Sequence, residues 1–169
     1  MPEKATIKRA RRDARQGKSA TTQAGEFVRE EIHHIRRGKH GARSTKQAIA
    51  IGLSKARRAG VRLGAPKKGT TSAETRRKAQ RDVARGQRGT RKPARTRARA
   101  VTGALRREGR GAASRKALAR QARSSARRRG HRQLVSAARK AVRTKGPAGR
   151  RAAARKAART RRAHRAHRR

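Results

Sequence analysis

The sequence contains no cysteine, tyrosine or tryptophan and a single phenylalanine, Phe27. Without cysteine the chain can form no disulfide, no CxxC redox site and no cysteine-ligated zinc site. Proteins that read single-stranded nucleic acid stack its bases on aromatic side chains, and one phenylalanine does not supply such a platform. Base recognition by stacking is therefore not expected.

Large apolar side chains are also scarce. Leu, Ile, Val and Phe make up 17 of 169 residues, which excludes a conventional core for this length and is typical of intrinsic disorder. No apolar run approaches the roughly 18 residues that a membrane-spanning helix needs, and residues 1–20 lack the apolar core of a signal peptide. We therefore expect a cytoplasmic protein; Glu3 and Asp13 argue against a mitochondrial transit peptide.

Positive charge is what the chain has in abundance. It carries 55 Lys+Arg against 8 Asp+Glu, a formal net charge of +47. Of the basic residues 41 are Arg, whose planar guanidinium can pair two phosphate oxygens at once. A GC-rich genome could explain why Arg exceeds Lys, but it does not explain the net charge. A polyanionic partner is therefore expected.

Charge and apolar residues divide the chain into three predicted parts. Residues 1–23 form a basic N-terminal arm, residues 24–63 a helical hairpin module, and residues 64–169 a low-complexity basic tail. Nine of the 17 large apolar residues lie in the hairpin segment. The net charge is +12 over residues 1–63 and +35 over residues 64–169.

The first helix of the hairpin is predicted from about Gly25 to Arg37. Its apolar residues follow the i, i+4, i+7 spacing of one helix face: Phe27 or Val28, then Ile32 and Ile35. We attribute its acids, Glu26, Glu30 and Glu31, to the helix N-terminus, where the dipole favours anions. Gly38 can take the left-handed position that ends the helix.

The second helix is predicted from about Thr45 to Ala59. Ser44 and Gln47 match a capping box, and Gly60 with Pro66 ends the helix. Ala48, Gly52 and Ala56 would let a partner helix approach closely, and Ile49 and Leu53 are expected to meet the Phe27, Ile32, Ile35 face. Because so small a hairpin covers its apolar faces poorly, either a homodimer through residues 24–63 or ordering on a ligand is expected.

The tail is rich in Ala and Arg, both strong helix formers, and glycines interrupt it at Gly86, Gly109, Gly130 and Gly146 before Pro147. Closely spaced arginines repel one another in a free helix. We therefore expect coil in dilute buffer and helix on a polyanion. The fold class is accordingly mostly disordered and otherwise all-α, a short antiparallel helical hairpin followed by a polycationic tail with inducible helices.

No catalytic or metal site is predicted. In the segment 64–71, Thr70 stands where a P-loop needs its lysine. His33, His34 and His40 are interpreted as polar-face histidines beside phosphate, since adjacent helical positions point about 100° apart and no cysteine or nearby acid completes a tetrahedral set. Glu30 and Glu31 lack a pocket-forming sequence around them. We expect no enzyme, no cofactor and no metal.

Residues 25–60, and above all the run KQAIAIGLSKAR at 46–57, resemble a family of small, basic and poorly characterised bacterial proteins with a short helical module. The resemblance implies a bacterial source and names no ligand. The tail is similar in composition to the tails of bacterial linker-histone-like proteins, and that similarity implies binding along DNA.

The function predicted from these features is nucleoid-associated, sequence-independent binding and condensation of double-stranded DNA through its phosphates. RNA or ribosome binding is one alternative, and an adaptor whose hairpin docks a protein is another. The predicted nucleic-acid-binding residues are arginines, four on the hairpin and the rest in the tail. They are Arg36, Arg37, Arg57, Arg58, Arg127, Arg128, Arg129, Arg150, Arg151, Arg161, Arg162, Arg168 and Arg169.

Overall fold

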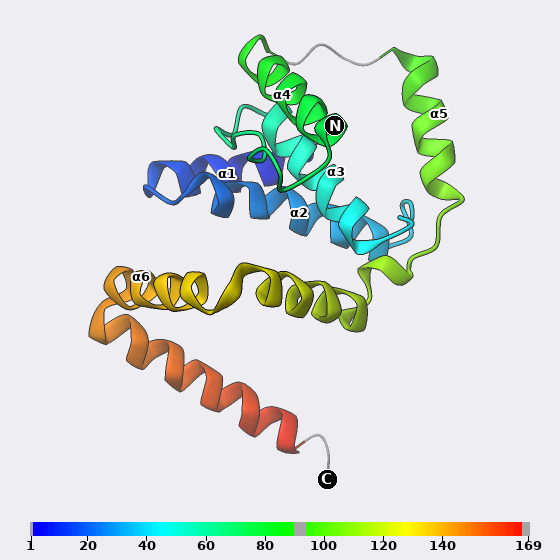
Figure 1. Ribbon diagram of the computed structural model, residues 1–169. Helices are drawn as coiled ribbons and strands as arrows, with labels where there is room; N and C mark the ends of the chain where they lie inside the picture. The colour runs from blue at the N-terminus through cyan, green and yellow to red at the C-terminus, as the bar shows by residue number, and fades with distance from the viewer. Residues whose placement is uncertain (1, 90–93, 167–169) are drawn as a thin grey trace. The chain divides into compact units, whose positions relative to one another are not determined.

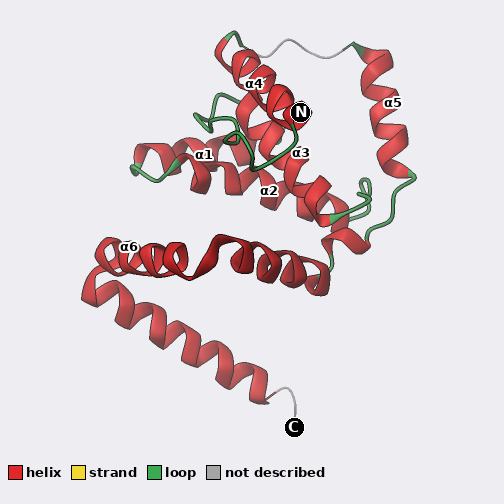
Figure 2. Cartoon of the chain, in the orientation of Figure 1, coloured by secondary structure: helices red, strands yellow, loops and turns green. Residues whose placement is uncertain are grey.

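The computed structural model describes residues 2–89 and 94–166, and all regular structure in these residues is helical (Figure 1, Figure 2). The helices are α1 Lys4–Arg15, α2 Ala20–Arg36, α3 Thr45–Arg58, α4 Ala73–Gln87, α5 Arg95–Arg106, the short 3₁₀ helix η1 Gly111–Ala113, and α6 Arg115–Ala166. The all-α expectation is confirmed. The expectation of a mostly disordered chain is not confirmed, because helices cover most of the described residues.

The chain divides into two compact units, residues 1–121 and residues 122–169. This boundary differs from the predicted ones after residues 23 and 63. The first unit extends the hairpin at both ends, because α1 packs against α2 and α4 packs against α3 (Figure 1). The second unit consists of most of α6 and the residues that follow it.

The hairpin itself is formed by α2 and α3. α2 begins at Ala20, earlier than predicted, because the Ser19 hydroxyl accepts the Thr22 N–H at 3.4 Å and caps the helix there. It ends as predicted before Gly38, whose φ of +74° is left-handed. α3 begins at Thr45 as predicted, with the Ser44 hydroxyl accepting the Gln47 N–H at 3.1 Å. The Gln47 Oε1 atom accepts a hydrogen bond from the N–H of Arg43, one residue before the cap, at 2.8 Å.

Small residues allow α2 and α3 to approach closely, as predicted. Ala48 and Ala56 are fully buried, and a Cβ atom at Gly52 would lie 2.6 Å from the Cα of Val28 on α2. The helix that packs closely against Ala48, Gly52 and Ala56 is therefore α2 of the same chain.

The core consists of two clusters rather than one seam. Ala10, Ala24, Phe27 and Ala56 form the first, with Leu53 partly buried against it. Ile32, Ile35, Ala42, Ala48 and Ala113 form the second. The prediction that Ile49 and Leu53 together meet one α2 face is therefore wrong for Ile49, which belongs to neither cluster because the smaller Ala48 and Gly52 occupy the contact.

Neighbouring elements of the same unit cover the hairpin. Ala10 of α1 packs in the Phe27 cluster, and Ala113 of η1 packs in the Ile35 cluster. On α4, Gly86 lies so close to α3 that a Cβ atom there would be 2.1 Å from the Arg57 carbonyl oxygen. Phe27 and Ile35 are thus buried within one chain. The homodimer through residues 24–63 stays a prediction, but its main physical reason, an uncovered apolar face on the hairpin, is removed.

Glycine interrupts α6 where the sequence predicts it. Gly130 has φ +73° and Gly146, before Pro147, has φ +60°, so the helix is broken at both positions. Gly109 lies between α5 and η1, as expected of a break. The predicted break at Gly86 is displaced by one residue, since α4 ends at Gln87. None of the helices in the described part of the chain is long and apolar enough to cross a membrane.

Candidate nucleic-acid interface

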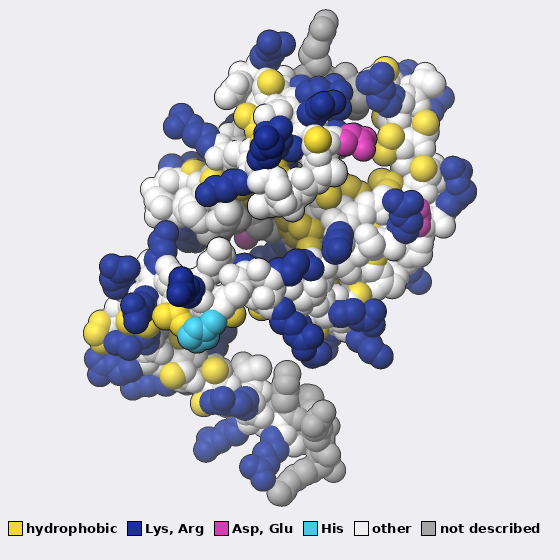
Figure 3. All heavy atoms as spheres, in the orientation of Figure 1, with side chains coloured by type: hydrophobic (Ala, Val, Ile, Leu, Met, Phe, Trp, Pro, Cys, Tyr) yellow, Lys and Arg dark blue, Asp and Glu magenta, His cyan; other side chains and the backbone are white. Residues whose placement is uncertain are grey.

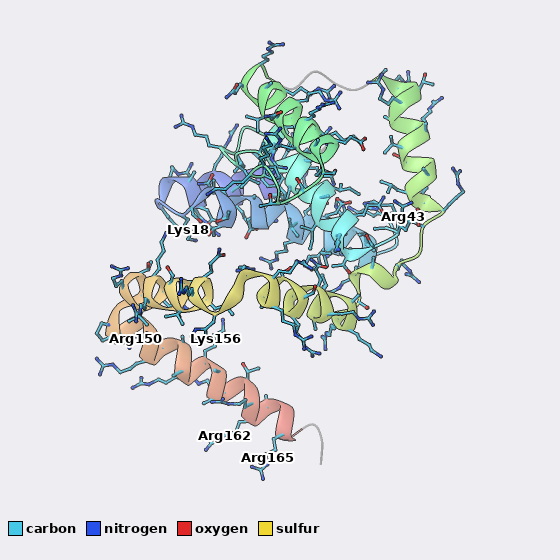
Figure 4. All side chains as sticks on the ribbon, viewed as in Figure 1. Lys18, Arg43, Arg150, Lys156, Arg162 and Arg165 are labelled. Carbon is cyan, nitrogen blue, oxygen red and sulfur yellow. The ribbon has the colours of Figure 1, made fainter. Side chains whose placement is uncertain are left out.

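The second unit presents a dense array of exposed cations. Residues 122–169 contain 19 Lys and Arg and no Asp or Glu. Each Lys and Arg between residues 122 and 166 is exposed, and Figure 4 shows Arg150, Lys156, Arg162 and Arg165 extending away from the α6 ribbon. The predicted residues that share this exposure are Arg127, Arg128, Arg129, Arg150, Arg151, Arg161 and Arg162. Arg168 and Arg169 lie outside the described residues.

These cations surround the helix instead of forming one stripe. Adjacent residues on an α-helix project about 100° apart, so Arg150 and Arg151, or Arg161 and Arg162, point in different directions. The part of α6 after Gly146 is about 30 Å long at 1.5 Å per residue. Such a helix can contact several phosphates along a polyanion, whereas a reader of base edges needs a few directed side chains.

Arg57, predicted as a nucleic-acid contact, is buried in the first unit and is poorly placed to reach a phosphate. The residue is 8% exposed, and its guanidinium donates to the carbonyl oxygens of Leu63 at 3.3 Å and Gly64 at 3.4 Å. Burial lowers the pKa of the Arg57 guanidinium, and the nearby Asp82 carboxylate opposes that effect. Arg57 therefore holds the segment after α3 in place.

The other three hairpin arginines differ in how free their side chains are to contact a phosphate. Arg36 is exposed overall, but its Nε atom donates to the Ala113 carbonyl at 2.9 Å. Arg58 lies 3.7 Å from the Asp82 carboxylate and is partly buried. Arg37 is exposed, and none of the ion pairs found in the described residues includes it. Of the four, Arg37 is the one best placed for a phosphate.

The predicted contacts of the second unit are runs of adjacent arginines, and they omit other cations that the structure exposes equally. Lys and Arg side chains are spread over the face shown in Figure 3, among few acidic ones. The additional exposed cations of the second unit are Arg123, Arg132, Arg139, Lys140, Arg143, Lys145, Arg155, Lys156, Arg159 and Arg165. The absence of acid from residues 122–169 was the available signal, since it leaves every cation there without a local counter-charge.

The acids concentrate elsewhere, in a buried cluster on the hairpin. Glu30 and Glu31 are 4% and 0% exposed and lie in the middle of α2, so the prediction that they complement the helix N-terminus is wrong. The Lys55 ammonium on α3 lies 2.6 Å from Glu31 Oε2 and 3.6 Å from Glu30 Oε1. A buried carboxylate needs such a partner, because desolvation of an unpaired charge costs several kcal/mol.

Glu3, before α1, connects the chain start to the end of α2. Its carboxylate accepts hydrogen bonds from His34 at 2.8 Å and Lys39 at 3.0 Å, and its backbone N–H donates to Glu30 at 3.1 Å. The hydrogen bonds from His34 and Lys39 lower the pKa of Glu3 to about 2. This carboxylate is therefore ionised at neutral pH.

Glu31, His34 and His40 come together at the same end of the hairpin. One side-chain ligand atom from each lies within 4.8 Å of the other two. The expectation that no nearby acid joins these histidines is wrong, because Glu31 and His34 are three residues apart on α2 and so share a face. His33 is exposed and does not take part.

Comparison with known proteins found no matching family model, no similar curated protein and no similar solved structure. The functional argument therefore depends on the charge and geometry of the described residues.

Proposed function

We propose that this protein binds double-stranded DNA without sequence preference, as a nucleoid-associated protein that neutralises and condenses DNA through phosphate contacts. The observation that carries the proposal is the exposed cation array of residues 122–166, a helical segment with no acidic residue. Ion pairs within the described residues all lie between Glu3 and Asp82, so none of them neutralises that array.

Phosphate contact without base readout follows from the residue types. Arginine pairs phosphate oxygens bidentately, and each neutralised phosphate releases condensed counterions. The one phenylalanine offers no platform for stacking bases, since Phe27 is 1% exposed in the hairpin core. Most of the binding free energy is therefore electrostatic and independent of sequence.

A free α6 brings many like charges close together, which destabilises a helix. We propose that residues 122–169, the part of the predicted tail that lies beyond the first unit, are largely coil in dilute buffer and that DNA favours the helix by neutralising this repulsion. Alanine, the strongest helix former, then stabilises it.

Binding of the full chain and of residues 1–121 to random duplexes, measured over a range of salt concentrations, tests the proposal. A cut at residue 63 would separate α4 from α3, where Ser54 donates to Asp82 at 2.6 Å, so the cut after residue 121 is preferable. We expect the full chain to bind far more tightly and with steeper salt dependence. Equal affinity of the two chains, or a preferred site bound more than about tenfold tighter, would contradict it.

RNA presents the same phosphate charge, so competition between duplex DNA and RNA of equal length decides between the two polymers. If the protein preferentially retains RNA, then RNA is its polyanionic partner instead of DNA. We do not adopt the adaptor alternative, because α1, α4 and η1 already cover the hairpin. No catalytic activity is proposed.

A further inference from the structure

We propose that Glu31, His34 and His40 bind a Zn²⁺ ion that fastens the loop after α2 to the hairpin. This inference concerns the first unit and is independent of DNA binding by the second. Two imidazoles and a carboxylate form a ligand set that Zn²⁺ favours, whereas Ca²⁺ and Mg²⁺ favour oxygen ligands.

The spacing of the three residues suits a single ion. Zn²⁺ holds nitrogen and oxygen ligands at roughly 2.0–2.2 Å, which places two ligands about 3.4 Å apart across a tetrahedral angle. His40 Nε2 lies 3.3 Å from Glu31 Oε1, and the His34 ligand atom lies within 4.8 Å of both residues' ligand atoms. Small side-chain rotations therefore bring all three to bonding distance.

A buried oxygen atom without a hydrogen-bond partner marks the place where the ion would bind. Glu31 Oε1 is buried and accepts no hydrogen bond among the described residues, although Oε2 of the same carboxylate contacts the Lys55 ammonium at 2.6 Å. A buried acceptor without a donor is costly. Monodentate binding of Zn²⁺ through Oε1 would satisfy this atom and leave the Lys55 contact intact.

The hydrogen bonds of the two histidines prepare them as ligands. His40 Nδ1 lies 3.0 Å from the Gly41 carbonyl oxygen, which can only accept, so Nδ1 carries a hydrogen and Nε2, 3.3 Å from Glu31 Oε1, is the ring atom left to bind a metal. His34 Nε2 lies 2.8 Å from the Glu3 carboxylate. Metal-bound histidines commonly donate their second N–H to a carbonyl or carboxylate in this way.

The loop that carries His40 is held in place from its other side. The Gly41 N–H donates to the Leu105 carbonyl at 2.8 Å, and the Ala42 N–H donates to the Gly109 carbonyl at 3.0 Å. A Cβ atom at Gly41 would lie 1.8 Å from the Glu108 carbonyl oxygen, so only glycine fits there. The Zn²⁺ ion would thus join α2 to the loop and, through the loop, to residues 105–109.

Cobalt and zinc titrations of the full chain, freed of metal by chelation and without nucleic acid, test the site. We expect Co²⁺ to bind at one equivalent with the intense visible bands of a tetrahedral or five-coordinate ion, and Zn²⁺ to remove those bands and raise the melting temperature. An absorption spectrum of octahedral Co²⁺ alone, or uptake that does not saturate at one equivalent, would overturn the proposal.

Substitutions separate this site from adventitious histidine binding. His34→Gln and His40→Gln should each weaken Zn²⁺ binding at least tenfold, whereas His33→Gln, on the exposed side of the same helix, should leave it unchanged. An equal loss in all three variants would overturn the site. Circular dichroism of the metal-free variants checks that they fold. If one variant is unfolded, the other variant and the wild-type cobalt spectrum still decide whether the metal site exists.

Discussion

At the scale of single residues, the α2–α3 contact depends on the missing side chain of Gly52. We predict that Gly52→Ala destabilises the protein by about 1–3 kcal/mol, because the new Cβ atom would lie 2.6 Å from Val28 Cα. Gly25→Ala on α2 is the matched control, since nothing lies within 4 Å of its Cβ position, and it should be neutral or stabilising by up to about 1 kcal/mol. Urea unfolding of both variants measures the difference, and equal stabilities would contradict the close contact.

The N-cap of α3 is a second residue-scale feature. Ser44→Ala should cost about 1 kcal/mol, because the Gln47 N–H loses its acceptor at 3.1 Å. Ser44→Asp keeps a side-chain acceptor and should retain most of the stability. Chemical unfolding compares the two, and a loss of the same size in both would mean that the hydroxyl has another role.

At the scale of elements, Leu53 of α3 packs against the cluster that joins α1, α2 and α3. We predict that Leu53→Asp costs several kcal/mol, because it brings a carboxylate against Phe27, Ala24 and Ala10 without a partner. Leu134→Asp is the control, since Leu134 lies on α6 and is 40% exposed. Thermal melts followed by circular dichroism should show a large loss for the first and little change for the second.

Leu53→Asp also tests the expected self-association through residues 24–63. Because α1 covers the Phe27 face, a monomer would be consistent with the structure, and sedimentation of the full chain measures the oligomeric state. A dimer that Leu53→Asp abolishes would restore the expectation drawn from the sequence.

The helix content of α6 is expected to rise when the protein binds DNA. We predict a larger helical circular dichroism signal for the full chain at saturating duplex than in dilute buffer, because phosphates neutralise the repulsion between neighbouring arginines. The chain ending at residue 121 is the control and should change less. An unchanged signal at saturation would contradict helix induction without contradicting DNA binding.

At the scale of the whole molecule, charge separates the two units. The 8 acidic residues all precede Ala122, so the net charge is 36 − 8 = +28 over residues 1–121 and +19 over residues 122–169. Internal pairs such as Lys55 with Glu31 and Lys18 with Asp13 are already deducted in the +28, so the two units differ in charge density: 28 net charges over 121 residues against 19 over 48. The second unit retains its full charge for a partner.

We predict that neutralising four tail arginines together lowers the salt dependence of DNA binding. Substitution of Arg150, Arg151, Arg161 and Arg162 by Gln should reduce the slope of log affinity against log salt by up to about 3.6, at about 0.9 per phosphate contact. The four Arg→Lys changes keep the charge and are the matched control. A slope that the Gln variant leaves unchanged would exclude these residues as phosphate contacts.

Much of this protein could be predicted from its sequence because the signals are local. Composition alone excludes disulfides and a large core, the capping residues and Gly38 locate the start of α3 and the end of α2, and Gly130 and Gly146 break the tail. The predicted start of α2, about Gly25, is later than the observed start at Ala20, since Ser19 gives a cap without the capping-box partner. Helix propensity and capping act within a few residues, and so they can be followed along the chain.

The tertiary structure decided what depends on residues distant in the sequence. It buried Arg57 against residues 63–64, covered the hairpin with α1 and α4, and placed Glu31 between Lys55 and His40. A charge pattern predicts that cations meet phosphate, but it does not distinguish a buried arginine from an exposed one, because burial is set by which helices pack together. The sequence therefore determined the polycationic character of this chain, and only packing determined which of its charges remain available.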